Sequence, residues 1–100
     1  MVKKFDVFFC EGKGGEKPCV VLSPDDMNQA LPYVLIAPIT KLTRGFPCRV
    51  GVKLKGQTGQ IALDLIRSVP KAQLSKRIGT LPQPLQEEIL KLLKELLISR

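Results

Sequence analysis

The chain has 100 residues, of which 44% are hydrophobic, and it carries a formal net charge of +7. A chain of this length supports one domain with one modest core, and we expect residues 1–100 to form it. The apolar content excludes a disordered chain, and no apolar run reaches the length of a membrane span. No histidine is present, which excludes histidine-based triads, histidine acid–base pairs and most zinc sites.

Positive charge is concentrated before the last segment of the chain. Residues 1–81 hold 13 basic and 6 acidic side chains, whereas residues 82–100 hold three of each. A surplus confined to one part of a short chain favours a polyanionic partner, either nucleic acid or an acidic polypeptide. Solubility alone also accounts for a moderate positive charge, so both explanations stay open.

The cysteines and the N-terminal segment indicate the compartment. Cys10, Cys19 and Cys48 are odd in number and widely spaced, which predicts buried free thiols in a reducing cytoplasm rather than metal ligands. Residues 1–12 contain two lysines but only a very short apolar stretch and no small-residue cleavage site, so they are not a signal peptide. We therefore expect a cytoplasmic protein that does not contact membranes.

The first elements in chain order are short strands. Residues 5–10 predict one strand and residues 19–23 a second, with Pro18 fixing the backbone at its start. Ser23 then predicts the N-cap of a helix of one or two turns. The segment 33–40 is apolar on both faces, so we expect a central strand or one covered by another subunit.

Residues 48–55 alternate in polarity, which predicts a strand with Arg49, Lys53 and Lys55 facing outward as a basic stripe. Residues 59–69 predict another strand and residues 75–81 a short final one. An apolar stripe then predicts a C-terminal helix and consists of Leu85, Ile89, Leu92, Leu93, Leu96 and Leu97. The expected fold is mainly β, a small antiparallel barrel or bent sheet closed by one amphipathic helix.

Three polar positions could carry chemistry. Lys17 precedes Pro18, where it is either part of a loop that feeds a strand or a rigidly held contact for an anion. Thr40 ends an apolar strand with a hydroxyl group. The strand propensity of a β-branched residue alone also accounts for a threonine at this position. Asp64 sits in an apolar run, where a carboxylate needs a partner, and Lys17 and Arg67 are the obvious ones. A structural ion pair and a functional site are equally compatible with Asp64.

The order of these signals resembles the MazF/PemK toxin family along essentially the full chain. The resemblance rests on short motifs: Lys-Pro at 17–18 before a valine-rich strand, Ala-Pro-x-Thr at 37–40, Asp-x-Ile-Arg-Ser-Val at 64–69, Lys-Arg-Ile-Gly-x-Leu at 76–81 and a terminal helix. Members of the family are small cytoplasmic endoribonucleases of toxin–antitoxin pairs, built on an SH3-like barrel with a C-terminal helix. The resemblance implies the same fold and activity class here.

The resemblance also implies the site residues. Lys17 stands where the family has its key arginine, Thr40 matches the active-site threonine, and both are expected to be catalytic. Asp64 matches the family's acidic position and, with Glu16, is expected to support proton transfer. Contacts to RNA are expected from Lys13, Lys41, Arg44, Arg49 and Arg67.

The chain departs from the family pattern in three places. Lys17 keeps the positive charge of arginine but lacks the planar fork that holds a phosphate with two hydrogen bonds. Leu65 stands where the family usually has glutamine, and the segment between the first two strands is shorter than usual. These departures imply weaker activity or a different sequence preference.

The function implied by the resemblance is metal-independent and cofactor-independent cleavage of single-stranded RNA, leaving a 2′,3′-cyclic phosphate and a 5′-hydroxyl. The resemblance further implies a homodimer and an antitoxin partner with an acidic disordered segment. DNA is expected to bind only weakly or through the antitoxin complex. Two alternatives stay open: a catalytically weakened module that still binds RNA or antitoxin, and a toxin acting on a protein target, as CcdB toxins of the same fold do.

Overall fold

A computed structural model describes residues 2–12, 14–41 and 48–98. These residues form seven strands in one antiparallel sheet. Six of them follow in the order β4-β5-β3-β2-β1-β7, and the seventh, β6, pairs with β3. The elements are β1 (Asp6–Gly12), β2 (Gly15–Val21), α1 (Asp25–Ala30), β3 (Tyr33–Lys41), β4 (Arg49–Leu54), β5 (Gln57–Ala62), η1 (Leu63–Leu65), β6 (Arg67–Pro70), η2 (Lys71–Gln73), β7 (Leu74–Thr80) and α2 (Gln83–Leu97).

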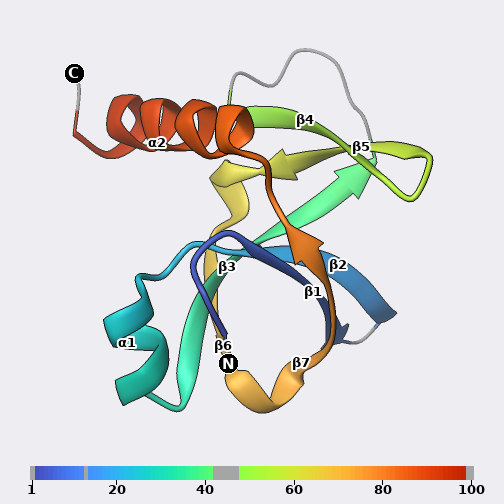
Figure 1. Ribbon diagram of the computed structural model, residues 1–100, viewed down its shortest axis with the longest axis vertical. Helices are drawn as coiled ribbons and strands as arrows, with labels where there is room; N and C mark the ends of the chain where they lie inside the picture. Colours follow the sequence, from blue (N-terminus) through green and yellow to red (C-terminus); the bar gives the residue numbers. More distant parts are fainter. Residues whose placement is uncertain (1, 13, 42–47, 99–100) are drawn as a thin grey trace.

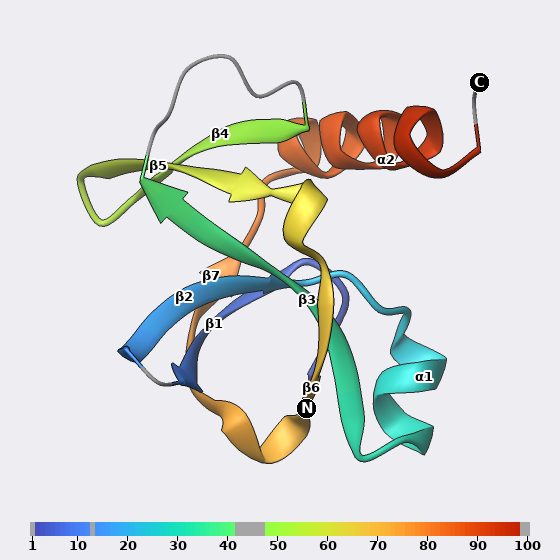
Figure 2. The same ribbon diagram turned by 180° about the vertical axis from the view of Figure 1, so that it is seen from behind.

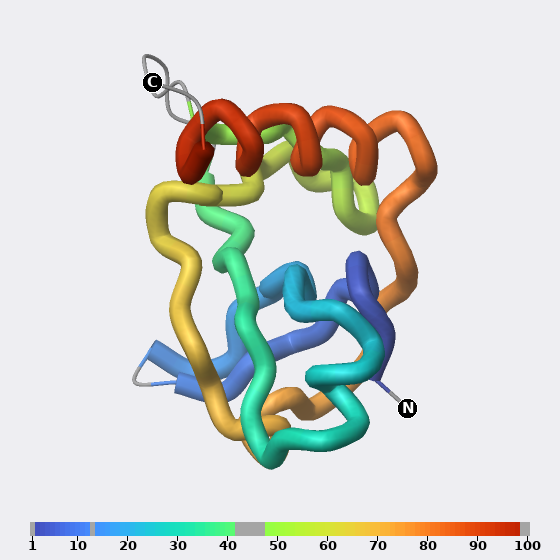
Figure 3. The backbone as a smooth tube through the Cα atoms, turned by 90° about the vertical axis from the view of Figure 1, so that its left-hand side faces the viewer, coloured from blue at the N-terminus to red at the C-terminus, as the bar shows by residue number. Residues whose placement is uncertain are grey.

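The sheet is strongly curled. Strands β1, β2 and β7 bend around the lower half of the molecule, while β4 and β5 lie beside α2 at the top (Figure 1). The view from behind shows β3 running from one half to the other (Figure 2). The side view places α2 and α1 toward opposite ends of the long axis (Figure 3). The predicted class, a mainly β fold with a bent antiparallel sheet and a C-terminal helix, is confirmed.

Two hydrophobic cores lie on opposite faces of β1, β2 and β3, because successive side chains of a strand point to opposite faces. The first core joins these strands to β4, β5 and α2 and contains Phe5, Val7, Val20, Leu22, Ala37, Ile39, Val50, Val52, Ile61, Leu63, Leu81 and Ile89. The second core contains Phe8, Cys10, Cys19, Val21, Val34, Ile36 and Val69. Together they explain why the segment 33–40 is apolar on both faces without a second subunit.

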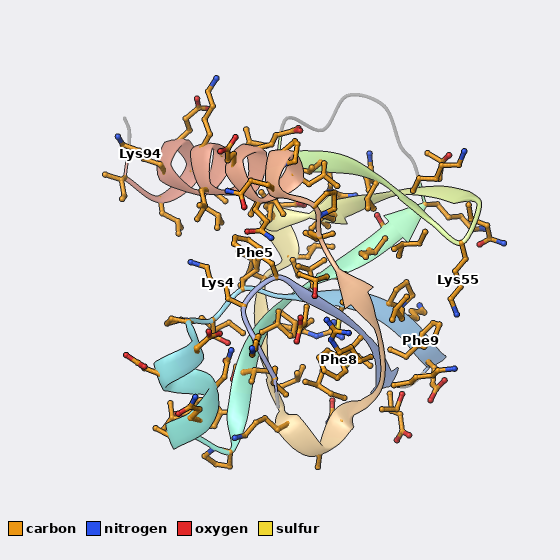
Figure 4. The ribbon with its side chains drawn as sticks, in the orientation of Figure 1. Lys4, Phe5, Phe8, Phe9, Lys55 and Lys94 are labelled. Carbon is orange, nitrogen blue, oxygen red and sulfur yellow. The ribbon has the colours of Figure 1, made fainter. Side chains whose placement is uncertain are left out.

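The hairpin of β4 and β5 turns through Lys55 and Gly56, whose φ angles are 47° and 82°. Positive φ at both central residues is what a two-residue type I′ turn requires, and glycine adopts it at no steric cost. Figure 4 shows Lys55 reaching from this turn toward β1, where its ammonium lies 5.9 Å from the centroid of the Phe9 ring. Lys53 and Lys55 are exposed, as the predicted basic stripe requires.

Besides shifts of one or two residues at the ends of other strands, three features differ from the sequence-based expectation. Strand β2 begins at Gly15 rather than at residue 19, because the hairpin with β1 extends past Pro18, which pairs with Phe9. Ser23 does not cap α1, whose N-cap is Pro24. The Ser23 hydroxyl instead donates a hydrogen bond to the side-chain oxygen of buried Asn28 and accepts one from a β3 backbone amide.

The predicted strand over residues 59–69 is the third difference. The chain follows one edge of β3 throughout, first as β5 opposite Ile39–Lys41 and then as β6 opposite Tyr33–Ile36. Between the two pairings the register advances by three residues, which form the short helix η1. Buried Leu63 anchors this insertion in the first core. The insertion therefore sets the direction of Asp64 and Leu65, which simple alternation along one strand would not predict.

Candidate active site

A groove with a volume of about 820 Å³ opens on the face of the sheet that carries the second core. Its walls come from the β1–β2 hairpin, the end of β3, η1 and the start of β6. Its polar lining includes Glu11, Lys17, Thr40, Lys41, Arg67 and Gln73. The groove thus brings together both predicted catalytic residues and two of the predicted RNA contacts, from segments far apart in the sequence.

Lys17 reaches this groove because of its position on β2. It shares a face with Cys19 of the second core, and the strand places it opposite Cys10 on β1. The side chain is exposed and folds back over Gly14: a Cβ built on Gly14 would lie 3.3 Å from the Lys17 ammonium nitrogen. The absence of a side chain at position 14 therefore leaves room for the ammonium group at the rim of the groove.

Thr40 is half-buried at the end of β3 and is connected to a hydrogen-bond network. Arg49 Nη1 donates to Thr40 Oγ1 and to Gln60 Oε1, each over 3.2 Å. The same guanidinium donates from Nε and Nη2 to the two carboxylate oxygens of Asp64, over 2.7 and 3.1 Å. Arg49 therefore bridges three side chains from β3, β5 and η1.

The network changes the ionisation of its members. The hydrogen bond from Arg49 holds the pKa of Asp64 below its ordinary value, with smaller help from the Asp64 backbone amide and the guanidinium charge. The hydrogen bond to Asp64 in turn raises the pKa of Arg49. Because a general base near neutral pH needs a pKa near 7, this pairing makes Asp64 a poor proton acceptor.

These contacts correct two expectations. The partner of Asp64 is Arg49, not Lys17 or Arg67. Arg49 does not belong to the solvated basic stripe, since only 11% of its side chain is exposed. The three-residue insertion at η1 is the reason, because it turns Asp64 toward the start of β4.

Glu16 lies outside the groove. It precedes Lys17 on β2 and so points to the opposite face, where its carboxylate accepts a 2.8 Å hydrogen bond from the Ser75 hydroxyl. Glu11 is also a lining residue of the groove, but it pairs with Glu16 across the β1–β2 hairpin, so its side chain points to the same face as Glu16 and away from Lys17. Lys13 and Arg44, two further predicted RNA contacts, lie outside the described residues.

The sequence reasoning missed Gln60. Gln60 is 5% exposed and holds Arg49 from the side opposite Asp64. A polar residue inside the apolar run "GQIAL" was the available signal, because buried amides need partners. Leu65, which stands in place of the family's glutamine, is 47% exposed and lines the groove.

A smaller hollow of about 200 Å³ adjoins the groove and shares Pro18, Ile39, Thr40 and Lys41 with it. Gly59 of β5 lines this hollow and packs directly against the backbone of β3. A Cβ built on Gly59 would lie 2.9 Å from the carbonyl oxygen of Thr40, closer than side chains pack. Only glycine fits at this position without moving the backbone that carries Thr40.

The cysteines and the acidic residues give no sign of a metal site in the described part of the chain. No group of three histidine, cysteine, aspartate or glutamate side chains converges there. Cys10, Cys19 and Cys48 are free thiols, and Cys48 is only partly buried. Burial, and to a lesser degree the neighbouring Cys10 thiol, raise the pKa of Cys19 to about 12, so it stays protonated at neutral pH.

Taken together, the curled antiparallel sheet and a groove lined by lysine, arginine and a hydroxyl define a small β protein with a site suited to polyanions. The family model of PemK-like, MazF-like toxins of type II toxin–antitoxin systems matches residues 3–97. The chain belongs to this family. A comparison with curated proteins gives no match.

Solved structures share the fold at low sequence identity. An endoribonuclease in complex with its cognate antitoxin, from a mycobacterial species, has a TM-score of 0.85 and 22% identity, covering 94% of this chain and 92% of that one. MazE–MazF from Deinococcus radiodurans has a TM-score of 0.84 and 23% identity, covering 99% and 97%. The Mycobacterium tuberculosis toxin MazF-mt6 has a TM-score of 0.80 and 20% identity, covering 90% and 93%.

Among the described residues, neither α1 nor α2 is long and apolar enough to cross a membrane.

Proposed function

We propose that this protein is a sequence-preferring endoribonuclease toxin that cleaves single-stranded RNA without a metal ion and is neutralised by a cognate antitoxin. One observation carries the proposal: in a chain of the MazF/PemK family, a single groove holds Lys17, Thr40, Lys41 and Arg67. Those side chains supply what phosphodiester cleavage needs, namely positive charge, a hydrogen-bond donor and a binding track for the RNA backbone.

The proposed reaction uses the substrate's own nucleophile. The 2′-oxygen attacks the adjacent phosphorus and loses its proton, the bond from phosphorus to the 5′-oxygen breaks, and that oxygen takes up a proton. The products are a 2′,3′-cyclic phosphate and a 5′-hydroxyl. DNA lacks the 2′-hydroxyl, so it would bind in the groove without being cut.

We assign the roles from the positions in the groove. The Lys17 ammonium stabilises the charge that grows on the phosphate and gives a proton to the leaving 5′-oxygen. The Thr40 hydroxyl donates a hydrogen bond to a non-bridging oxygen. The 2′-hydroxyl proton passes to a solvent water molecule, because Glu11 and Glu16 pair across β1 and β2 and point to the face opposite Lys17. Lys41 and Arg67 bind neighbouring phosphates, and Lys13 and Arg44 remain predicted contacts.

We also propose that the chain forms a homodimer and that an acidic, disordered segment of the antitoxin occupies the cationic groove. The support comes from solved structures: MazE–MazF from Deinococcus radiodurans and a mycobacterial endoribonuclease with its cognate antitoxin have this fold. The net charge of +7 suits an acidic partner. The apolar segment 33–40 no longer argues for a dimer, because both of its faces lie in cores of the same chain.

The first prediction concerns cleavage of a long single-stranded RNA in the presence of EDTA. The wild type should cut it and leave DNA of the same sequence intact.

Lys17→Ala and Thr40→Val should each lower kcat/KM about 10²- to 10³-fold at an unchanged melting temperature, since one preorganised donor at such a site is worth that much. Lys17→Arg should keep or raise the activity, because a guanidinium grips two phosphate oxygens.

The outcomes separate the alternatives. Cleavage that EDTA abolishes, or products with 5′-phosphates, would contradict the proposed chemistry. RNA binding without cleavage by the wild type, restored by Lys17→Arg, would indicate a weakened enzyme. Absence of both binding and cleavage would favour a toxin with a protein target.

A further inference from the structure

Arg49 is tied to Asp64 in a way that leaves it little freedom to bind RNA. Two of its nitrogens engage the two carboxylate oxygens over 2.7 and 3.1 Å, which is the bidentate geometry that fixes both position and rotation of a guanidinium. Its side chain is 11% exposed. Lys17, Lys41 and Arg67 are by contrast exposed residues that line the groove.

The remaining nitrogen of the guanidinium, Nη1, points at the site. It donates to Thr40 Oγ1 over 3.2 Å and to the buried Gln60 Oε1 over the same distance. Gln60 therefore holds the nitrogen from β5, while Asp64 holds the rest of the group from η1. Three elements of the fold thus converge to aim one N–H group at the Thr40 oxygen.

This contact decides which way the Thr40 hydroxyl acts. A hydroxyl has one hydrogen and two lone pairs, and Arg49 occupies the oxygen as a donor. The hydroxyl hydrogen is then left to donate elsewhere. Its partner in the described structure is the Lys41 carbonyl oxygen at 3.4 Å, a long and weak bond that a phosphate oxygen can replace.

We propose that Arg49 is a positioning residue, held by Asp64 and Gln60, which fixes the Thr40 hydroxyl as a donor toward the scissile phosphate. The inference rests on the proposed endoribonuclease function and deepens it, and it changes the role of Arg49 from an RNA contact to a support for Thr40. The guanidinium charge beside the oxygen also makes the hydroxyl a stronger donor, because hydrogen bonds with a charged partner are stronger than neutral ones.

The test is a double-mutant cycle of Arg49→Lys and Thr40→Val. Lysine keeps the charge but cannot bond Asp64, Thr40 and Gln60 from one rigid plane. Arg49→Lys should lower kcat about tenfold and leave KM within about twofold, because Arg49 positions Thr40 and does not itself bind RNA. In the Thr40→Val background the same change should alter kcat less than about twofold, since nothing is left to position.

Arg77→Lys is the matched control. Arg77 forms the other described arginine–aspartate pair, with Asp6 at 3.4 Å, and is not among the residues that line the groove. It should lower the melting temperature at most and leave kcat unchanged. Effects of Arg49→Lys and Thr40→Val that multiply, or a rise in KM with unchanged kcat, would overturn the inference, because Arg49 would then act on RNA directly.

A measurement without RNA separates this inference from the proposed function. The NMR order parameter of the Thr40 methyl group should fall in Arg49→Lys and stay at the wild-type value in Arg77→Lys. If the wild type cuts no RNA, the proposed function fails. The order parameter of the Thr40 methyl group still tests whether Arg49 positions Thr40. An unchanged order parameter in Arg49→Lys would overturn the positioning whether or not RNA is cut.

Discussion

Arg49 and Asp64 form the closest ion pair described in this protein, with 2.7 Å between Nε and Oδ1. The pair sits at the surface end of the network, where 36% of the Asp64 side chain is exposed. Solvent screens such a pair, so its main effect is geometric rather than a large gain in stability. What it fixes is the plane of the guanidinium and, through it, the oxygen of Thr40.

The pH dependence of stability follows from this pair. Because the pKa of Asp64 is lowered in the folded state, its stabilising contribution is complete above its ordinary value and is lost as the pH falls through the folded pKa. Asp64→Asn should therefore lower the free energy of unfolding by a constant amount from about pH 7 to about pH 5, and by less below about pH 4. Urea titrations at several pH values measure this, and a difference that grows toward acid would contradict it.

Some residues of the candidate site were predictable from the sequence, but their contacts were not. The family resemblance pointed to Lys17 and Thr40, and the groove contains both. Asp64 was given the wrong partner, since no local pattern reports that η1 advances the register by three residues.

Among the elements, β3 does the most to assemble the site. It pairs with β2, β5 and β6, contributes residues to both cores and delivers Thr40 and Lys41 to the groove. Its nature was predictable, because a strand that is apolar on both faces must be covered on both. The break between β5 and β6 was not, since the apolar run "IALDLI" reads equally well as continuous strand.

The helix α2 offers a clean comparison of two neighbouring residues. Ile89 is fully buried in the first core, whereas Leu90 is 46% exposed. Ile89→Ala should lower the free energy of unfolding by about 2–4 kcal/mol, as deletion of buried methyl groups does. Leu90→Ala should change it by less than about 1 kcal/mol. Chemical denaturation measures both, and an equal loss in Leu90→Ala would mean that another chain covers this helix face.

For the whole molecule, the position of the positive charge matters more than its amount. Residues 82–100, which include α2, add no net charge, while the described groove carries Lys17, Lys41 and Arg67 at its surface. A single strand of RNA laid along these cations would release counterions from its phosphates. Binding should therefore weaken steeply as salt is added.

The size of that salt effect can be predicted. Each phosphate contact of a single strand contributes a slope of about 0.7, so three contacts give a slope of about 2 for log Kd against log salt concentration. A 2′-O-methyl RNA, which cannot attack its own phosphate, allows Kd to be measured without cleavage. Arg67→Met should lower the slope by about 0.7. A slope near zero, or one that this substitution leaves unchanged, would show that the groove is not the RNA track.

The close packing of Gly59 affects which substitutions inactivate the protein. It offers RNA no side chain, yet a Cβ there would lie 2.9 Å from the carbonyl oxygen of Thr40. Every missense change at its codon must therefore displace the strand end that carries the hydroxyl. In a genetic selection for cells that survive expression of the toxin, substitutions at Gly59 should appear beside those at Lys17 and Thr40. Under the proposed function, the substitutions that inactivate the protein thus extend to a residue that supplies no side chain to the reaction.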